Sequence, residues 1–350
     1  MDITEYLYEV GGAEYAGGTQ AEYDGGARRA AAKIVTDTVS KDQVISSLIP
    51  DTVSECSLCV ERAPGDPCTS APTIKSIGTV LGVDGTNAEI MSSAKATLKC
   101  ETEKCVLTKL APRIGDDVAR REIVGRLKVA GPTCSKLLSN VNIDDVMAQW
   151  GIHYADFYPY HFNMRNYASY SFVDGRTIHE PDTLATVLFR DLYTGEHNGV
   201  KHRCCACVIN TDVYQGEGKH WMALFADARG ETWTVEFFNS SGNAPAPEFA
   251  SWLVKTKNAM EDLNPKSNPQ IVKASPVQLQ MSKSECGVYS LFYIWARLHN
   301  VPASYFSNGG IPDQLMFEFR QHLFDDPTRP SVEVFDWDKY RTTTKITWEK

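Results

Sequence analysis

The sequence has no run of apolar residues long enough to cross a membrane as a helix. Its strongest apolar stretch, 288–296, falls far short of the about 20 residues that a membrane-spanning helix needs. The first residues carry neither the positive cluster nor the apolar stretch of a secretory signal. We therefore expect no membrane span and a protein of the cytosol, or a soluble cargo protein.

Basic residues are also in short supply. Lys and Arg number 35 against 44 Asp and Glu, which gives a formal net charge of −9. Proteins that bind a phosphate backbone carry clustered positive charge, often interleaved with aromatic side chains, and no such patch stands out. We therefore expect no nucleic-acid partner. The composition is that of an ordinary folded protein, and a chain of 350 residues has room for two domains.

Ten cysteines are present. In a chain of this length without a secretory signal, we expect reduced thiols rather than a disulfide framework. Cys56 and Cys59 form a C-x-x-C pair with Cys68 nearby, and Cys100 and Cys105 follow. Structural zinc is the alternative, but a zinc site needs four suitably spaced ligands and no histidine lies close to these cysteines. We expect free thiols here, no metal site and no cofactor.

Low-complexity sequence marks the beginning of the chain. Residues 1–45 contain three Gly-Gly pairs, at 11–12, 17–18 and 25–26, with Ala-Glu-Tyr occurring twice between them. Glycine-rich sequence of this kind predicts a flexible extension rather than part of a packed core.

Two domains and a tail are expected after this extension. Residues 46–131 mix polar loops with short helical patterns, which predicts a small, mainly helical domain. The triplet Ala-Gly-Pro at 130–132 has the composition of a junction. We place the second domain at 132–325 and a polar C-terminal tail at 326–350.

The second domain contains both strand-like and helical patterns. A helix is expected at 142–150, capped by Ser139 or Asn142. Strands are expected at 204–211, 221–227, 233–238 and 270–274, and further helices at 249–263 and 286–299. A tight turn at 229–231 predicts a hairpin between the second and third strands. Strands clustered between helices predict an α+β fold with a central, mostly antiparallel sheet flanked by helices.

Cys286 opens the most apolar helical run of the chain. A thiol attacks as the thiolate, and the start of a helix favours an anion through its free N–H groups and its dipole. We therefore expect a lowered pKa and a nucleophilic Cys286. Gly287 follows, and its lack of a side chain would let a substrate carbonyl approach closely.

Three polar residues complete a candidate site around this cysteine. His220 precedes one strand of the predicted hairpin and Asn239 ends the other, so the two side chains are expected to meet as base and orienter. Gln280 lies six residues before Cys286 and could donate, with the Cys286 N–H, to an oxyanion. Gln278 is an alternative for that role.

Each of these features, considered alone, also occurs by chance in proteins that are not enzymes. With ten cysteines and eight histidines, some Cys/His pair is expected at any spacing. A Cys-Gly pair opening an apolar helix is more often a packed core thiol, and His220 alone is an ordinary strand-end histidine. From the residues alone, the order of His220, Asn239, Gln280 and Cys286 supports the hypothesis of a cysteine hydrolase.

In these segments the chain resembles the ubiquitin-like-protein and adenovirus-type cysteine proteases, and among them the viral enzymes. The likeness is carried by 208–212, 218–221, 233–243, 285–287 and 292–294, with weaker likeness at 100–107, at 142–150 and at 319–324. It implies a papain-like, ubiquitin-like-protease core with a small, mainly helical N-terminal arm domain.

The resemblance also implies the roles of individual residues. His220, Asn239 and Cys286 match the catalytic triad, and Gln280 matches the oxyanion glutamine. Asn239 stands where the wider family has an aspartate. Trp221 is expected to form one wall of a narrow tunnel for two substrate glycines, although ordinary hydrophobic packing also explains a tryptophan at this position.

The activity that the resemblance implies is a cysteine endopeptidase. It would cut after Gly-Gly in viral structural polyproteins during virion maturation, in the host cytoplasm at viral factories and in the virion. Two alternatives stay open: a protease that removes a ubiquitin-like modifier ending in Gly-Gly, and an inactive module that binds Gly-Gly peptides. The three Gly-Gly pairs of the extension add the hypothesis of self-cleavage, against which stands the simpler interpretation of a linker.

Overall fold

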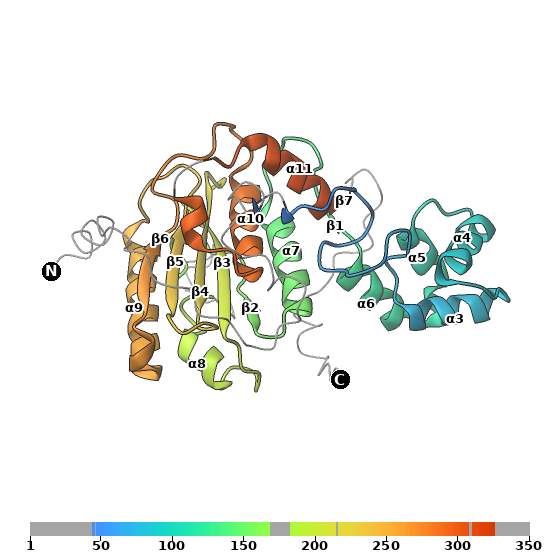
Figure 1. Ribbon diagram of the computed structural model, residues 1–350, viewed down its shortest axis with the longest axis horizontal. Helices are drawn as coiled ribbons and strands as arrows, with labels where there is room; N and C mark the ends of the chain where they lie inside the picture. The colour runs from blue at the N-terminus through green and yellow to red at the C-terminus, as the bar shows by residue number, and fades with distance from the viewer. Residues whose placement is uncertain (1–43, 46, 169–182, 215, 308–309, 326–350) are drawn as a thin grey trace, which may run out of the picture.

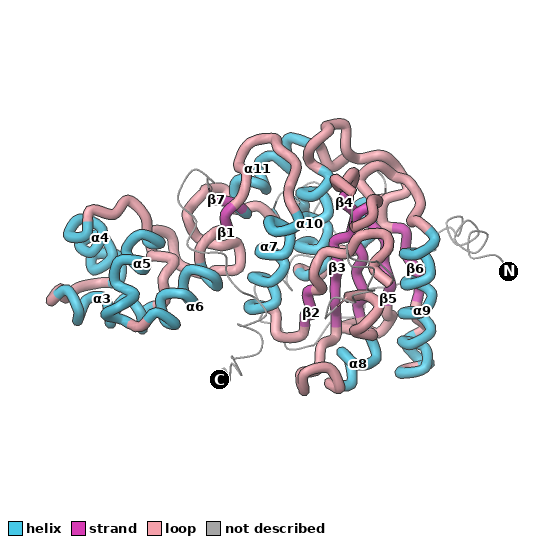
Figure 2. Tube along the Cα trace, turned by 180° about the vertical axis from the view of Figure 1, so that it is seen from behind, coloured by secondary structure: helices cyan, strands magenta, loops and turns pink. Residues whose placement is uncertain are grey.

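The computed structural model describes residues 44–325, except 46, 169–182, 215 and 308–309 (Figure 1). A small group of helices lies beside a larger part in which helices surround a sheet (Figures 1 and 2). The predicted extension, apart from its last residues, and the predicted tail lie outside the described residues.

The smaller part is helical, as predicted. It contains α3 (Ala71–Leu81), α4 (Asn87–Leu98), α5 (Glu103–Ile114) and α6 (Asp116–Arg126). Thr86 begins α4 with a capping box that includes Glu89, and the Thr102 side chain caps α5. The apolar faces of these helices meet in a core of their own, which includes Ile74, Ile77, Val106, Leu107 and Leu110.

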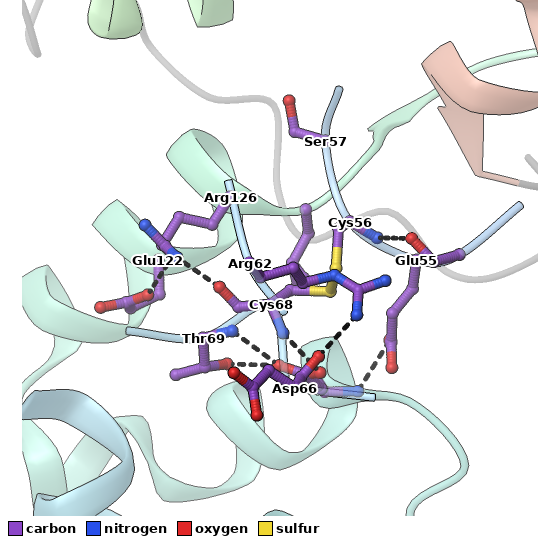
Figure 3. Close-up of a disulfide and its surroundings, with 12 residues drawn as sticks. Glu55, Cys56, Ser57, Arg62, Asp66, Cys68, Thr69, Glu122 and Arg126 are labelled. Carbon is purple, nitrogen blue, oxygen red and sulfur yellow. Dashed lines mark hydrogen bonds and ion pairs between the residues drawn. A yellow bond between two sulfur atoms is a disulfide. The ribbon is translucent and has the colours of Figure 1, made fainter. Parts of the chain in front are cut away.

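Two disulfides lie in this helical part, and they correct the expectation of free thiols. Cys56 is bonded to Cys68 and Cys100 to Cys105. Figure 3 shows the first of these disulfides, between Cys56 and Cys68. The buried carboxylate of Glu103 accepts hydrogen bonds from the backbone N–H groups of Cys68 at 2.9 Å and of Thr69 at 2.8 Å. The remaining cysteines are free thiols. The spacing of the cysteines in the sequence could not show which of them are bonded, because the fold of the chain brings each pair of sulfur atoms together.

The larger part is built on a five-stranded mixed sheet in the order β2-β3-β4-β5-β6. Its strands are β2 (Phe157–Pro159), β3 (Cys204–Asn210), β4 (Trp221–Asp227), β5 (Thr234–Phe238) and β6 (Gln270–Lys273). The pairs β3–β4 and β4–β5 are antiparallel, and the predicted hairpin is β4–β5. The edge strands β2 and β6 pair in parallel with their neighbours, so the expected antiparallel arrangement holds for the three central strands.

Helices cover both faces of the sheet (Figure 1). One face carries α7 (Asn140–His153), α10 (Cys286–Leu298) and α11 (Asp313–Leu323), and the other carries α8 (Phe189–Thr194) and α9 (Pro247–Leu263). Side chains alternate between the faces: Ala223 and Phe225 of β4 join the α10 core, whereas Met222 and Leu224 join the α9 core. Short 3₁₀ turns occur at Pro265–Ser267 and Ala303–Phe306.

Three contacts tie the ends of the described chain to the rest of the fold. Val44 and Ile45 pack into the α10 core, and the Trp295 indole donates to the carbonyl of Leu48 at 3.1 Å. The predicted boundary at 45/46 therefore falls inside a segment that packs on the sheet domain. At the junction, β1 (Val129–Ala130) pairs in parallel with β7 (Phe324–Asp325).

Within the described ranges, no helix combines the length and the hydropathy that a membrane span requires.

Candidate active site

His220 and Asn239 meet at one end of the β4–β5 hairpin. His220 immediately precedes β4 and Asn239 immediately follows β5, and the antiparallel register brings these ends together. The His220 Nε2 atom lies 2.8 Å from the Asn239 Oδ1 atom. The structure thus brings together the predicted base and the predicted orienter.

The hydrogen bonds of Asn239 fix the tautomer of the histidine. Asn239 Oδ1 also accepts from the backbone N–H of Ser241 at 3.0 Å and from its hydroxyl at 2.8 Å, while Nδ2 donates to the Asn243 carbonyl at 3.2 Å. Because this atom faces a backbone donor, it is the oxygen, and His220 Nε2 must carry the proton that it accepts. In the neutral ring, Nδ1 is then left as a proton acceptor.

Cys286 is the first residue of α10 and lies against the start of β4. Its side chain is buried, and the backbone N–H groups of Trp221, Gly287 and Cys286 itself interact with the sulfur. Because Trp221 directly follows His220, the contact with the Trp221 backbone places the sulfur next to the residue that bears the imidazole.

The pKa of Cys286 is raised above the ordinary value of a thiol, contrary to the sequence prediction. Burial is the largest cause, and the neighbouring Glu285 carboxylate also raises it. The N–H groups of the helix start and of Trp221 act in the lowering direction but do not offset the loss of solvation. Burial of the sulfur therefore favours the neutral thiol over the thiolate.

Gln280 is held in one orientation beside the Asn239 turn. Its Oε1 accepts from the Ser240 hydroxyl at 2.8 Å, and its Nε2 donates to the Ser282 carbonyl at 2.8 Å. The backbone N–H of Gln280 also donates to the Ser240 carbonyl at 3.0 Å. One amide N–H of Gln280 is used in this way, and the second is available to a ligand. Gln278, the alternative, is exposed.

Trp221 and Gly287 share a neighbour, Leu138. The Trp221 indole N–H donates to the Leu138 carbonyl at 3.0 Å, and the Phe162 ring meets the indole edge-on at 6.1 Å. A Cβ atom added at Gly287 would come within 3.1 Å of the Leu138 side chain. Close packing against Leu138 therefore favours a glycine at this position. The predicted role of Gly287, to let a substrate carbonyl approach, stays a prediction.

Sequence reasoning missed a buried ion pair beside the cysteine. The Arg320 guanidinium contacts the carboxylate of Glu285, the residue before Cys286, at 2.8 Å. Asp313 was also missed: its carboxylate accepts from the backbone N–H groups of Met281 and Ser282, at 3.1 and 2.7 Å. Glu285 lies in the segment 285–287 that carries the resemblance, but no local signal pointed to Arg320, because the two residues are 35 positions apart in the chain.

A pocket of about 450 Å³ opens on the Asn239 side of His220. Its lining includes both of these residues together with Arg165, Thr211 and Asn243. The polar groups that it offers to a ligand are therefore an imidazole, a guanidinium, amides and a hydroxyl. Within the described part of the chain, no group of three or more His, Cys, Asp or Glu side chains is placed to hold a metal ion.

The fold, with a buried cysteine at the start of the central helix and a histidine–asparagine pair at the facing hairpin, is that of a cysteine protease. The family model for the Ulp1 protease family, C-terminal catalytic domain, matches residues 201–332. The chain is 34% identical to a cysteine protease of African swine fever virus (isolate Tick/Malawi/Lil 20-1/1983) over 291 residues, which are 79% of this chain and 98% of that protein.

A second isolate and a crystal structure agree with this match. A protein named as a SUMO-1 cysteine protease, from African swine fever virus (isolate Tick/South Africa/Pretoriuskop Pr4/1996), is 33% identical over 287 residues, 79% of this chain and 98% of that protein. A crystal structure of the protease from African swine fever virus matches with a TM-score of 0.62 at 31% identity, covering 80% of this chain and 98% of that chain. The chain belongs to the Ulp1 family of cysteine proteases, which confirms the resemblance drawn from its sequence.

Proposed function

We propose that the protein is an endopeptidase that cleaves viral structural polyproteins after Gly-Gly during virion maturation, with Cys286 as nucleophile and His220 as base. One observation carries this proposal. The hydrogen bond from His220 Nε2 to Asn239 leaves Nδ1 of the same ring as a proton acceptor. The next residue, Trp221, contacts the Cys286 sulfur through its backbone N–H. We propose the host cytoplasm, at viral factories, and the virion as its locations.

The raised pKa of Cys286 decides how the reaction begins. Because the resting thiol is neutral, His220 Nδ1 takes the proton from the sulfur while the sulfur attacks the carbonyl carbon of the second glycine. The carbonyl oxygen becomes an oxyanion, which the backbone N–H of Cys286 and the second amide N–H of Gln280 stabilise. Asn239 holds the imidazole in position throughout.

The second half of the reaction reverses the proton movement. The imidazolium of His220 donates its Nδ1 proton to the leaving amine, the carbon–nitrogen bond breaks, and a thioester remains on Cys286. A water molecule then attacks the thioester carbon while Nδ1 accepts its proton. The free carboxylate leaves, and the sulfur regains a proton from His220.

The preference for two glycines follows from the crowding around Cys286. Trp221 is fixed by its hydrogen bond to Leu138 and by the edge-on contact with Phe162, so its ring cannot easily move aside. A substrate chain without Cβ atoms at its last two residues passes such a wall, whereas a larger side chain collides with it.

Peptide cleavage tests the proposal directly. Gly-Gly-Ala peptides should be cut after the second glycine, and Cys286→Ala and His220→Ala should abolish turnover. Asn239→Ala should keep part of it, because Asn239 orients the ring and does not react. Cys134→Ala, which removes an exposed free thiol, is the matched control and should cleave normally. Binding without any turnover by the unmodified protein would instead support the inactive Gly-Gly-binding module.

Removal of a ubiquitin-like modifier is the second candidate function. It is favoured by the match to the Ulp1 family and by the name SUMO-1 cysteine protease of one relative. The chemistry at Cys286 would be the same, and the substrate would be a folded domain with a Gly-Gly tail. Faster cleavage of a ubiquitin-like fusion than of a matched linear Gly-Gly-Ala peptide would support this candidate over the polyprotein protease.

Self-cleavage at the protein's own Gly-Gly pairs, 11–12, 17–18 and 25–26, is a narrower part of the proposal. These pairs lie outside the described residues, and their sequence is what supports the idea. Intact-mass analysis after long incubation should show a shortened N-terminus in the active protein and a full-length chain in Cys286→Ala. Equal full-length masses would contradict self-cleavage and leave the linker interpretation.

A further inference from the structure

The pocket beside His220 lies away from the surface assigned to the two glycines. Its lining includes His220 and Asn239, whereas Cys286 and Trp221 belong to the core on the α10 face of the sheet. Met222, which follows Trp221 along β4, lines the pocket and points to the α9 face. The pocket therefore extends to the α9 face of the sheet, whereas the Trp221 indole belongs to the α10 face.

In the proposed function, the scissile bond of the substrate lies beside the imidazole of His220. In the proposed function, the two glycines before the scissile bond lie against Trp221, and the segment after that bond leaves as an amine protonated by His220. That segment must continue from the imidazole in the other direction. We propose that the pocket lined by Arg165 and Asn243 receives the residues that follow the scissile bond. This inference rests on the proposed function.

Arg165 gives the pocket its chemistry. The guanidinium Nε donates to the Glu248 carboxylate at 3.0 Å, and neither Nη atom donates to any side chain or carbonyl in the described ranges. Arg165 is about half exposed, with a side-chain exposure of 48%. A guanidinium with both Nη groups unused can donate a pair of hydrogen bonds to one carboxylate, or a single bond to a backbone carbonyl.

The rest of the lining selects for size and polarity. Met222, Ala244 and Ala246 provide short apolar walls, and Thr211 and Asn243 provide polar groups. A volume of about 450 Å³ holds one or two residues of extended peptide but not a folded domain. The ligand class is therefore a short peptide segment with a hydrogen-bond acceptor, from an acidic side chain or from the backbone, opposite Arg165.

Substrates with one acyl half and different leaving groups test this inference. The first substrate ends in Gly-Gly-aminomethylcoumarin, so no amino acid follows the scissile bond. The others are internally quenched peptides with the same residues before the bond and Ala-Asp, Ala-Asn or Ala-Lys after it. The measured quantity is kcat/KM for a peptide divided by kcat/KM for the coumarin substrate. Arg165→Ala should lower this ratio about tenfold, as expected for the loss of a charged hydrogen bond.

A matched control removes the same charge elsewhere. Arg190 is exposed on α8, and the C-terminal part of α8 is hydrogen-bonded next to the start of β3, which pairs with the end of β4 away from His220. Arg190→Ala should therefore leave the ratio unchanged. The three peptides separate the two sources of the acceptor. Loss confined to the Asp peptide identifies the acidic side chain, and equal loss for all three identifies the backbone carbonyl.

The breakdown of the acyl-enzyme adds a second measurement. The coumarin and the peptides give the same thioester on Cys286, so the Arg165→Ala deacylation rate should equal that of the unmodified protein. An unchanged ratio, or a changed deacylation rate, would overturn the assignment of the pocket. Failure of the unmodified protein to cleave either kind of substrate would overturn the proposed function itself, and this outcome is distinct because it needs no Arg165 variant.

Discussion

Arg320 donates hydrogen bonds from Nε and Nη2 to a single carboxylate oxygen of Glu285, at 3.1 and 2.8 Å. Both side chains are buried, with 0% and 3% exposure. Glu285 directly precedes Cys286, and the third donor of Arg320, Nη1, lies 3.1 Å from the Pro132 carbonyl. One guanidinium thus connects the residue before the cysteine to the junction between the helical part and the sheet domain.

We expect Arg320→Met to be strongly destabilising, because it leaves the Glu285 carboxylate buried and without its partner. Breaking a buried pair in this way costs about 3–5 kcal/mol, which urea unfolding would measure. We also expect a loss in kcat on the order of 100-fold, since displacement of Cys286 by a small distance suffices for that. The double variant Glu285→Gln with Arg320→Met should recover much of the stability. Equal stability of the single variant and the unmodified protein would contradict a role for the pair.

The raised pKa of Cys286 predicts an unusual alkylation profile. If the resting thiol is neutral, the rate of alkylation by iodoacetamide should rise about tenfold per pH unit from pH 6 to above pH 8.5, because only the thiolate reacts. A standing thiolate–imidazolium pair would instead give a rate that is flat across this range. Stopped-flow labelling followed by mass spectrometry of the Cys286 peptide measures the profile, and a flat curve would refute base catalysis from a neutral pair.

Gln280 and Gln278 offer a matched comparison within one loop. Gln280→Ala removes an oxyanion donor, and we expect kcat to fall by about 100-fold, or about 3 kcal/mol of transition-state stabilisation. Gln278→Ala removes the same amide from an exposed position, where it donates to the Gln280 carbonyl at 2.9 Å, and it should lower kcat far less than Gln280→Ala does. Steady-state kinetics on a Gly-Gly-Ala peptide compares them. If the two variants lose activity equally, the donor has been assigned to the wrong glutamine.

The Cys56–Cys68 disulfide should contribute measurably to the stability of the helical part. It closes a loop with a sequence separation of 12, for which the chain-entropy relation gives about 3 kcal/mol. Replacing both cysteines by serine should lower the unfolding midpoint in urea by a corresponding amount. Cys134→Ser changes a free, exposed thiol and serves as the control. Identical midpoints for the control and the double variant would show that the disulfide contributes nothing.

His202 should make the fold sensitive to acid. Its ring nitrogens are buried without a hydrogen-bond partner among the described residues, and burial lowers the pKa of His202 to about 4. In the unfolded chain this histidine binds a proton near pH 6.5, whereas in the folded protein it binds one only near pH 4. The free energy of unfolding is therefore highest above pH 6.5 and decreases as the pH falls toward 4. The loss amounts to roughly 3 kcal/mol.

The variant His202→Phe isolates this contribution. The Tyr158 ring packs against His202 at 5.3 Å, and phenylalanine can keep that contact without a titrating group. We expect the unmodified protein to lose more stability than His202→Phe between pH 6.5 and pH 4, as measured by urea unfolding at each pH. Parallel stability curves would exclude His202 as the acid-sensitive group.

Local sequence patterns determined most of the core elements. The predicted strand at 221–227 is β4 to the residue, the predicted helix from Cys286 is α10, and Ser139 caps α7 as one of the two named candidates. These features depend on side-chain periodicity and on capping groups a few residues apart, which a single chain displays directly. The hairpin that joins His220 to Asn239 is local in the same sense.

The features that escaped prediction depend on distant parts of the chain. The elements β2, α8 and α11 carried too weak a pattern, and the parallel pairing of the edge strands requires connections longer than any local signal. Arg320 and Asp313 gave no hint of their partners, because a buried hydrogen bond exists only after the helix that carries it has docked.

The sequence by itself therefore determined the candidates for the chemistry, since the order of His220, Asn239, Gln280 and Cys286 and their place at or near element ends can be read from the chain. Tertiary structure alone decided the electrostatic state of the cysteine, the pairing of the disulfides and the pocket beside the imidazole. The physical reason is that solvation, charge pairing and cavity shape depend on everything packed around a group, whereas strand and helix patterns depend on its near neighbours. Burial of the sulfur outweighs the favourable helix start that the sequence made visible.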